Sequence, residues 1–177
     1  MKNDFNQFIE CLKKASRRID RHYFQLDIAG SKGSTYRERV YCYELYHQLR
    51  CVLGDNFPYK LDGEVDKAGH PVIWQRLGAR KPDFIVHVPG EMNRNLVIIE
   101  VKPVTVKNRM NELTKDLETL KGFLNKAKYY RAIMLIYGDG ESDLRNEILN
   151  EVQKFSEERI LLVWHQEPGE ELIIVKK

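Results

Sequence analysis

The segment spanning residues 81–102 constrains the fold of this chain more than any other part, and it reads KPDFIVHVPGEMNRNLVIIEVK. Two apolar runs, residues 84–88 and 96–99, flank a polar break that contains Gly90. Apolar runs of this length around a glycine-containing break are typical of a β-hairpin. Because residues 96–99 are apolar without interruption, we expect them to form a central strand that is buried on both faces.

Three charged residues lie at one end of this expected hairpin. With a turn near residues 91–93, Asp83 falls almost opposite Glu100. Glu100 and Lys102 are two positions apart on one strand, so their side chains project from the same face. Charges at the end of a buried strand need partners or a metal ion, because their desolvation is costly. The pattern therefore indicates a site for a hard divalent cation beside a polarised water, with a structural Asp–Lys ion pair as the alternative.

The same segment resembles the PD-(D/E)XK nuclease superfamily, whose members share the restriction-endonuclease-like fold. Asp83 matches the aspartate of the family's Pro-Asp dipeptide, Glu100 its second acidic position and Lys102 its lysine. The direct match covers only residues 81–102. The resemblance implies an α/β fold with a restriction-endonuclease-like core, in which helices flank a mixed central sheet.

The resemblance also implies a metal-dependent hydrolysis of phosphodiester bonds. Asp83 and Glu100 would bind Mg²⁺ or Mn²⁺ together with the backbone carbonyl of Val101, and Lys102 would orient the attacking water. DNA is favoured over RNA as the substrate, and cleavage by an endonuclease or an exonuclease mechanism is open. Small members of the superfamily commonly dimerise, so a homodimer is compatible with the resemblance.

A helix expected over residues 37–53 supplies a further catalytic candidate. In the superfamily, an acidic residue on the first core helix often supports the metal, and Glu44 lies within the apolar pattern of this helix. Glu38, nearly two turns earlier, is the competing candidate, and a solvated surface position is the alternative for Glu44. Glu64 and Asp66, at the end of the first expected strand, are further candidates for an acidic ligand.

The apolar pattern of the whole chain predicts a single domain over residues 1–177, with an N-terminal helical extension over about residues 1–30. Helices are expected over residues 4–23, 37–53, 107–126 and 143–155, with Gly54 as a C-terminal cap of the second. Strands are expected over residues 59–65, 72–75, 83–88, 96–102, 132–137, 160–164 and 171–175. This order agrees with the core of the superfamily: a helix, a three-stranded meander, a crossover helix and a parallel strand.

Two groups of basic residues are candidates for contact with nucleic-acid phosphates. Lys13 and Arg17 belong to a basic stripe at helical spacing, whereas Arg76, Arg80 and Lys81 lead into the Pro-Asp dipeptide. The net charge of the chain is only +3, so the distribution of charge carries this inference. A solvated helix face is the alternative for the first group.

Composition narrows the class of protein. A chain of 177 residues with 42% hydrophobic content can bury a core. No apolar run approaches the roughly 20 residues that cross a bilayer, and the N-terminus has no apolar region of the signal-peptide type. We therefore expect a cytoplasmic protein without membrane contact. Cys11, Cys42 and Cys51 lack CxxC spacing and are expected to be reduced thiols.

Together these features predict a metal-dependent nuclease that acts on DNA. Two alternatives stay open. One is a non-catalytic nucleic-acid-binding or structural module on the same fold. The other is a subunit of a larger phage or defence assembly whose partners supply specificity. The presence of all three motif residues favours catalysis over the non-catalytic module.

Overall fold

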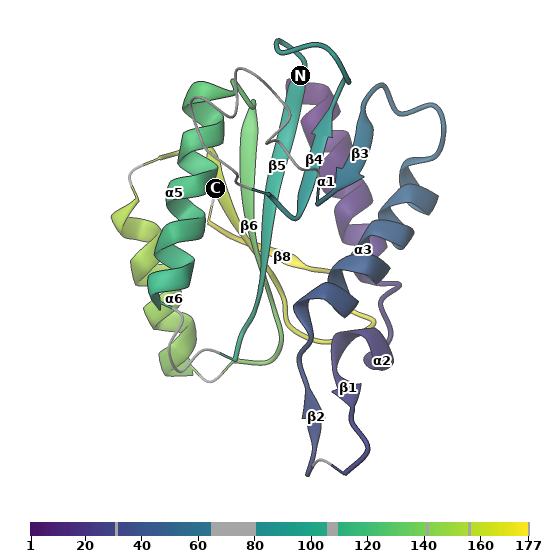
Figure 1. The fold of residues 1–177 in the computed structure, drawn as a ribbon, viewed down its shortest axis with the longest axis vertical. Helices are drawn as coiled ribbons and strands as arrows, with labels where there is room; N and C mark the ends of the chain where they lie inside the picture. The colour runs from purple at the N-terminus through teal and green to yellow at the C-terminus, as the bar shows by residue number, and fades with distance from the viewer. Residues whose placement is uncertain (31, 65–80, 106–109, 141, 156, 177) are drawn as a thin grey trace.

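A computed structural model describes residues 1–30, 32–64, 81–105, 110–140, 142–155 and 157–176 of the chain. A mixed six-stranded sheet in the order β3-β4-β5-β6-β7-β8 forms its centre, with helices on both faces (Figure 1). This arrangement confirms the α/β architecture that the sequence predicted. The strands are β3 (Lys60–Gly63), β4 (Phe84–His87), β5 (Asn95–Pro103), β6 (Arg131–Tyr137), β7 (Ile160–His165) and β8 (Ile173–Lys176).

The sheet contains the expected antiparallel meander, followed by a crossover to a parallel strand. β3, β4 and β5 pair antiparallel, while β5, β6 and β7 pair parallel and β8 returns antiparallel to β7. The parallel pairs require crossover connections, which contain α5 (Met110–Lys126) and α6 (Ser142–Lys154). These two helices lie on one side of the sheet in Figure 1.

The opposite face of the sheet is covered by α1 (Lys2–Ser16) and α3 (Glu38–Leu53). Phe8 and Leu12 of α1 are fully buried against this face, so the N-terminal helix is part of the main core. Helix α3 runs to the expected residue, Leu53, and Gly54 follows it with a positive φ of 63°. Such a left-handed residue commonly ends a helix, as predicted here.

The helix expected over residues 4–23 is interrupted. Helix α1 ends at Ser16, where the hydroxyl group donates to the carbonyl of Lys13 and accepts a hydrogen bond from the N–H of Leu172. Asp20 then caps a separate short helix, α2 (Arg21–Phe24), by accepting from the N–H of His22. Side-chain bonds to the backbone compete with helical ones, and here they favour a break in the helix.

Some expected elements differ in extent, and one lies outside the described residues. A small hairpin of β1 (Leu26–Asp27) and β2 (Ser34–Thr35) follows α2, in a stretch where the sequence predicted only a turn. Strands of two residues are too short to show an alternating pattern. The last strand, β8, begins two residues later than expected. The strand predicted over residues 72–75 lies outside the described residues.

The central hairpin has the predicted register. Phe84 pairs with Ile99 and Ile85 with Ile98, so Asp83 lies opposite Glu100. The connection spans residues 88–94 and includes Gly90 at a φ of 83°, which residues with a side chain rarely adopt. Strand β5 is buried from its first residue through Val101, as expected for a central strand.

The start of α3 is held over the carboxyl-terminal ends of β6 and β7 by aromatic contacts. Tyr41 stacks on Tyr137 with ring centroids 3.9 Å apart, and its hydroxyl group is 2.9 Å from Nδ1 of His165. Burial lowers the pKa of His165 to about 4, so its imidazole ring is neutral at pH 7. These contacts fix which face of α3 points towards the end of β5.

Within the described part of the chain, no helix is both long enough and apolar enough to cross a membrane. The three cysteines are free thiols, in agreement with the prediction, and Cys42 is the buried one. Its position on α3 brings it next to the charged residues at the end of β5.

Candidate functional site

Charged side chains from four parts of the chain meet at the carboxyl-terminal end of β5. Strand β5 lies at the centre of the sheet, between β4 and β6 (Figure 1). Four carboxyl groups surround one amine there, and we call this group the carboxylate cluster. Its members are Glu38 on α3, Asp83 just before β4, Glu100 and Lys102 on β5, and Asp116 on α5.

Asp83 and Glu100 form the buried part of the cluster. One carboxylate oxygen of Asp83, Oδ2, accepts a hydrogen bond of 2.7 Å from the N–H of Val101. Glu100 is only 6% exposed, and its carboxyl group interacts directly with that of Asp83. The two groups therefore converge on one face of the hairpin, as their register predicted.

Burial and mutual repulsion make this pair reluctant to ionise. Burial raises the pKa of Asp83 to about 6, and the charge of Glu38 adds to the increase, while the Val101 N–H and Lys102 oppose it. Burial also raises the pKa of Glu100 well above its ordinary value. The negative charges of Asp83 and Asp116 raise this pKa further. Without a cation, the pair therefore binds a proton more tightly than two separate carboxyl groups would.

Lys102 is held between two helices. Its amine Nζ lies 3.0 Å from Oε2 of Glu38 and 3.5 Å from Oδ2 of Asp116. Burial alone would lower the pKa of Lys102, but the carboxylates of Asp116 and Glu38 raise it above the ordinary value. Lys102 is therefore a fixed positive charge at neutral pH.

The cluster contains Glu38 rather than Glu44. Glu38 forms the ion pair with Lys102, whereas Glu44 accepts a hydrogen bond of 2.7 Å from Gln48 on the same helix. With 100° of rotation per residue, Glu38 and the buried Cys42 share a helix face that Glu44 does not. Of the two candidates, Glu38 is the one that contacts Lys102, and a catalytic role of Glu44 stays a prediction.

Asp116 was not predicted from the sequence. It lies within the apolar stripe of α5, one position before the fully buried Leu117. Its Oδ2 atom is buried and makes no hydrogen bond, although Lys102 is nearby. An acidic residue that interrupts an apolar stripe is the signal that identifies it, because such a position faces the protein and not the solvent.

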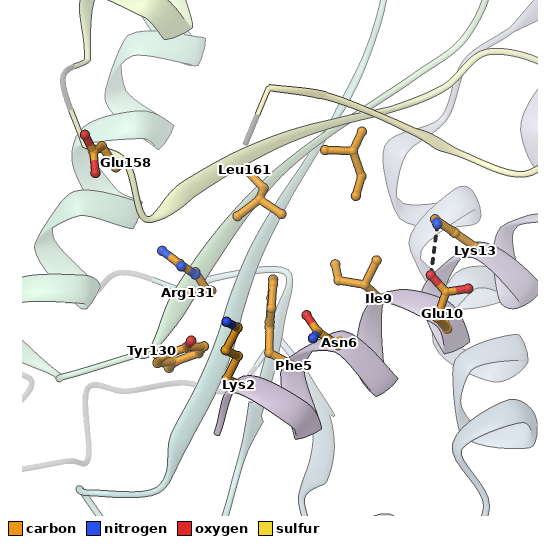
Figure 2. A pocket seen from close by; sticks show the side chains of 11 residues that line it. Lys2, Phe5, Asn6, Ile9, Glu10, Lys13, Tyr130, Arg131, Glu158 and Leu161 are labelled. Carbon is orange, nitrogen blue, oxygen red and sulfur yellow. Dashed lines mark hydrogen bonds and ion pairs between the residues drawn. The ribbon is translucent and has the colours of Figure 1, made fainter.

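The basic residues predicted to contact nucleic acid lie in different places. Lys13 forms an ion pair of 2.9 Å with Glu10, and Figure 2 shows the two side by side on α1 at the edge of a pocket. Arg131 also lines this pocket, at the start of β6, whereas the cluster lies at the opposite end of the sheet. Arg17 is 3.8 Å from Glu171.

The second basic group precedes the cluster in the chain. Lys81 is exposed and lies two residues before Asp83. Arg76 and Arg80 lie outside the described residues. Of the predicted basic contacts, Lys81 is thus the one that the structure places beside the cluster.

The oxygen atoms of the cluster suit a hard divalent cation. Mg²⁺ keeps several of its waters and needs only one or two protein carboxylates, so Asp83, Glu100 and the Val101 carbonyl fit such an ion. Burial is the main cause of the raised pKa values of both acids, with repulsion from neighbouring carboxylates adding to it, and a bound cation would offset both effects. Within the described ranges, no set of three or more His, Cys, Asp or Glu side chains is arranged as a metal-binding group.

No protein-family model matches the chain, and no curated protein matches it. The function therefore has to be inferred from the fold and from the chemistry of the carboxylate cluster.

Proposed function

We propose that this protein is a metal-dependent nuclease with a restriction-endonuclease-like core, and that it hydrolyses phosphodiester bonds in DNA. The supporting observation is the interaction of Asp83 with Glu100, and of both with the charge of Lys102, at the end of a buried central strand. A meander, a crossover helix and a parallel strand place these residues together, in the order that the resemblance implies.

Asp83 and Glu100, with the Val101 carbonyl, would hold Mg²⁺ or Mn²⁺. When bound, the ion would act as a Lewis acid on the phosphate and lower the pKa of the attacking water. Both carboxyl groups must be deprotonated to bind a cation, because metal ligands are deprotonated. Metal affinity should therefore increase as the pH rises through about 6, the pKa of Asp83.

Lys102 would stabilise charge and would not act as a base. Its raised pKa keeps the amine protonated at neutral pH, and a protonated amine cannot accept a proton from water. The ion pairs with Glu38 and Asp116 hold the amine in position before substrate binds. A preorganised positive charge of this kind lowers the energy of an electron-rich phosphorane-like transition state.

A non-catalytic module is the second candidate function. The observation that favours it is the engagement of Lys102 by two carboxylates, which a purely structural ion-pair network would also contain. Such a module would bind nucleic acid without cutting it. Measurements of metal binding and of DNA cleavage therefore distinguish the nuclease from the non-catalytic module.

The direct test is an assay of the purified chain. We expect it to bind Mn²⁺ in a calorimetric titration and to cleave or nick DNA in the presence of Mg²⁺ or Mn²⁺, but not in the presence of a chelator. Linear, circular and single-stranded DNA and RNA are compared in parallel. A chain that binds no metal and cuts none of these substrates would not be a nuclease, and the binding module would take its place.

Charge removal at Arg76, Arg80 and Lys81 should weaken DNA binding across all sequences. Each lost phosphate contact should reduce the slope of log affinity against log salt by about one unit. A second variant replaces Lys13 and Arg17 and tests the other predicted phosphate contacts by the same slope. Titrations at several salt concentrations provide the measurement. An unchanged slope in the triple variant would place the substrate path elsewhere.

A further inference from the structure

A pocket of about 390 Å³ borders the carboxylate cluster. This volume lies within the roughly 300–1,000 Å³ of small-molecule sites. The pocket is formed by α3 and by the ends of β3 and β4, and Cys42 and Asp83 belong to both the pocket and the cluster surroundings. A group bound there would therefore lie next to a phosphate held at Asp83 and Glu100.

Two tyrosines of α3 line this pocket. The hydroxyl group of Tyr46 donates to the carbonyl of Leu61, and its ring stacks near Phe84 at an interplanar angle of 17°. Tyr43, one helical turn earlier, lies on the same side of the helix. Its side chain is 63% exposed, the highest value among the exposed large hydrophobic side chains of the described residues. A fixed aromatic ring and an exposed one thus adjoin the same cavity.

The lining favours a neutral planar group over a phosphate. Among the described residues that line the pocket there is no lysine or arginine, whereas Asp62, Glu64 and Asp83 are acidic. Arg39, nearby, is 3.2 Å from a carboxylate oxygen of Glu64, which offsets its charge. Gly63 lines the pocket, and a Cβ there would contact Tyr46 and Phe84, so the absence of a side chain leaves room beside these two rings. An aromatic ring can stack there, but an anion would be repelled.

We propose that this pocket binds an unpaired nucleobase adjacent to the scissile phosphate, with the base stacked on Tyr43. The substrate would then be single-stranded or locally unpaired DNA, because a base inside a duplex has to leave its stack to enter a pocket. This inference rests on the proposed nuclease function, and it specifies the form of the substrate. Stacking on an aromatic side chain tolerates any base sequence.

The first test compares Tyr43→Ala, Tyr43→Phe and the control Tyr23→Ala, which removes another exposed tyrosine. Fluorescence anisotropy in the presence of a chelator, where no cleavage is expected, measures binding to a single-stranded oligonucleotide and to the matching duplex. Tyr43→Ala should weaken single-strand binding roughly 5- to 150-fold, the range found for a base stacked on an aromatic ring. Tyr43→Phe and Tyr23→Ala should bind like the wild type. An equal loss on the duplex, or no loss on the single strand, would overturn the proposal.

The second test fills the pocket with Gly63→Leu. The backbone at Gly63 is one that other residues adopt, and a Cβ there would make ordinary contacts of 3.5–3.7 Å. Gly63→Ala serves as the smaller control, and the melting temperature checks that both variants fold. We expect Gly63→Leu to lose single-strand binding while it keeps the Mn²⁺ affinity and melting temperature of the wild type. Unchanged single-strand binding in this variant would rule the pocket out as the base site.

Single-strand binding and DNA cleavage by the wild type test the base site and the nuclease function separately. A wild-type chain that binds single strands but cuts neither single strands nor duplex would not be a nuclease, and the two sets of variants would still decide whether the pocket holds the base. A wild-type chain that cuts duplex DNA and does not bind single strands would be a nuclease without the proposed base site.

Discussion

Asp83→Asn should abolish both metal binding and cleavage. The amide is neutral, so the cation would lose one of its two carboxylate ligands and would be undercompensated. A bound metal ion supplies several kcal/mol of charge stabilisation, and about 1.4 kcal/mol corresponds to a tenfold change in rate. Cleavage should therefore slow by roughly a thousandfold or more. Calorimetry with Mn²⁺ and a nicking assay measure the two effects on one preparation.

The matched control for this variant is Glu44→Gln. Glu44→Gln removes one negative charge, as Asp83→Asn does. Glu44 accepts a hydrogen bond from Gln48 on α3 and, among the described residues, forms no ion pair with Lys102, so this variant should have a metal affinity and a cleavage rate close to those of the wild type. Glu38→Gln, by contrast, should reduce cleavage, because Glu38 holds Lys102. Asp83→Asn protein that still binds Mn²⁺ with the affinity of the wild type would contradict the assignment of Asp83 as a ligand.

Asp83→Asn should also stabilise the metal-free protein, in a pH-dependent way. Because the folded-state pKa is about 6 and the ordinary value is 3.8, folding favours the protonated acid. The contribution of Asp83 to the free energy of unfolding is therefore most favourable below pH 3.8. It decreases as the pH rises, and above about pH 6 the full cost of the buried charge is present. The increase in Tm caused by the substitution should be larger at about pH 8 than at about pH 4. Thermal unfolding with a chelator present measures this difference.

The sequence predicted the central hairpin and its register because both depend on local patterns. An uninterrupted apolar run fixes residues 96–99 as a buried strand, and the two-residue period of a strand fixes which side chains share a face. Once the turn is placed, Asp83 must lie opposite Glu100, and Lys102 must lie on the same face. The paired strands agree with this prediction.

The rest of the site depends on contacts between distant elements. The sequence could not choose between Glu38 and Glu44, because the rotation of α3 is set by the stacking of Tyr41 on Tyr137 and by its contact with His165. Asp116 reaches Lys102 only because α5 crosses the sheet over the end of β5. The apolar stripe of α5 marks Asp116 as an unusual position, but it does not show which residue Asp116 contacts, so the pairing of both acids with Lys102 became apparent only in three dimensions.

Lys102→Ala should slow cleavage while it leaves most of the metal affinity intact. Asp83, Glu100 and the Val101 carbonyl remain to hold the ion, so a calorimetric titration should give a Mn²⁺ affinity close to that of the wild type. The loss of one preorganised stabiliser of developing charge typically costs about 10²- to 10³-fold in rate. Lys102→Met, which keeps the apolar stem of the side chain, should be equally slow, because the missing charge and not the packing causes the defect.

A second substitution separates the catalytic role of Lys102 from its role in stability. Without the amine, the carboxylates of Glu38 and Asp116 lose their shared cation, and two half-buried acids left without it destabilise the fold. Adding Asp116→Asn to Lys102→Ala removes one of these charges and should restore much of the lost Tm. It should not restore the cleavage rate, because no positive charge returns to the phosphate. A double variant that regains both Tm and rate would show that Lys102 serves only the fold, whereas recovery of Tm alone assigns its charge to catalysis.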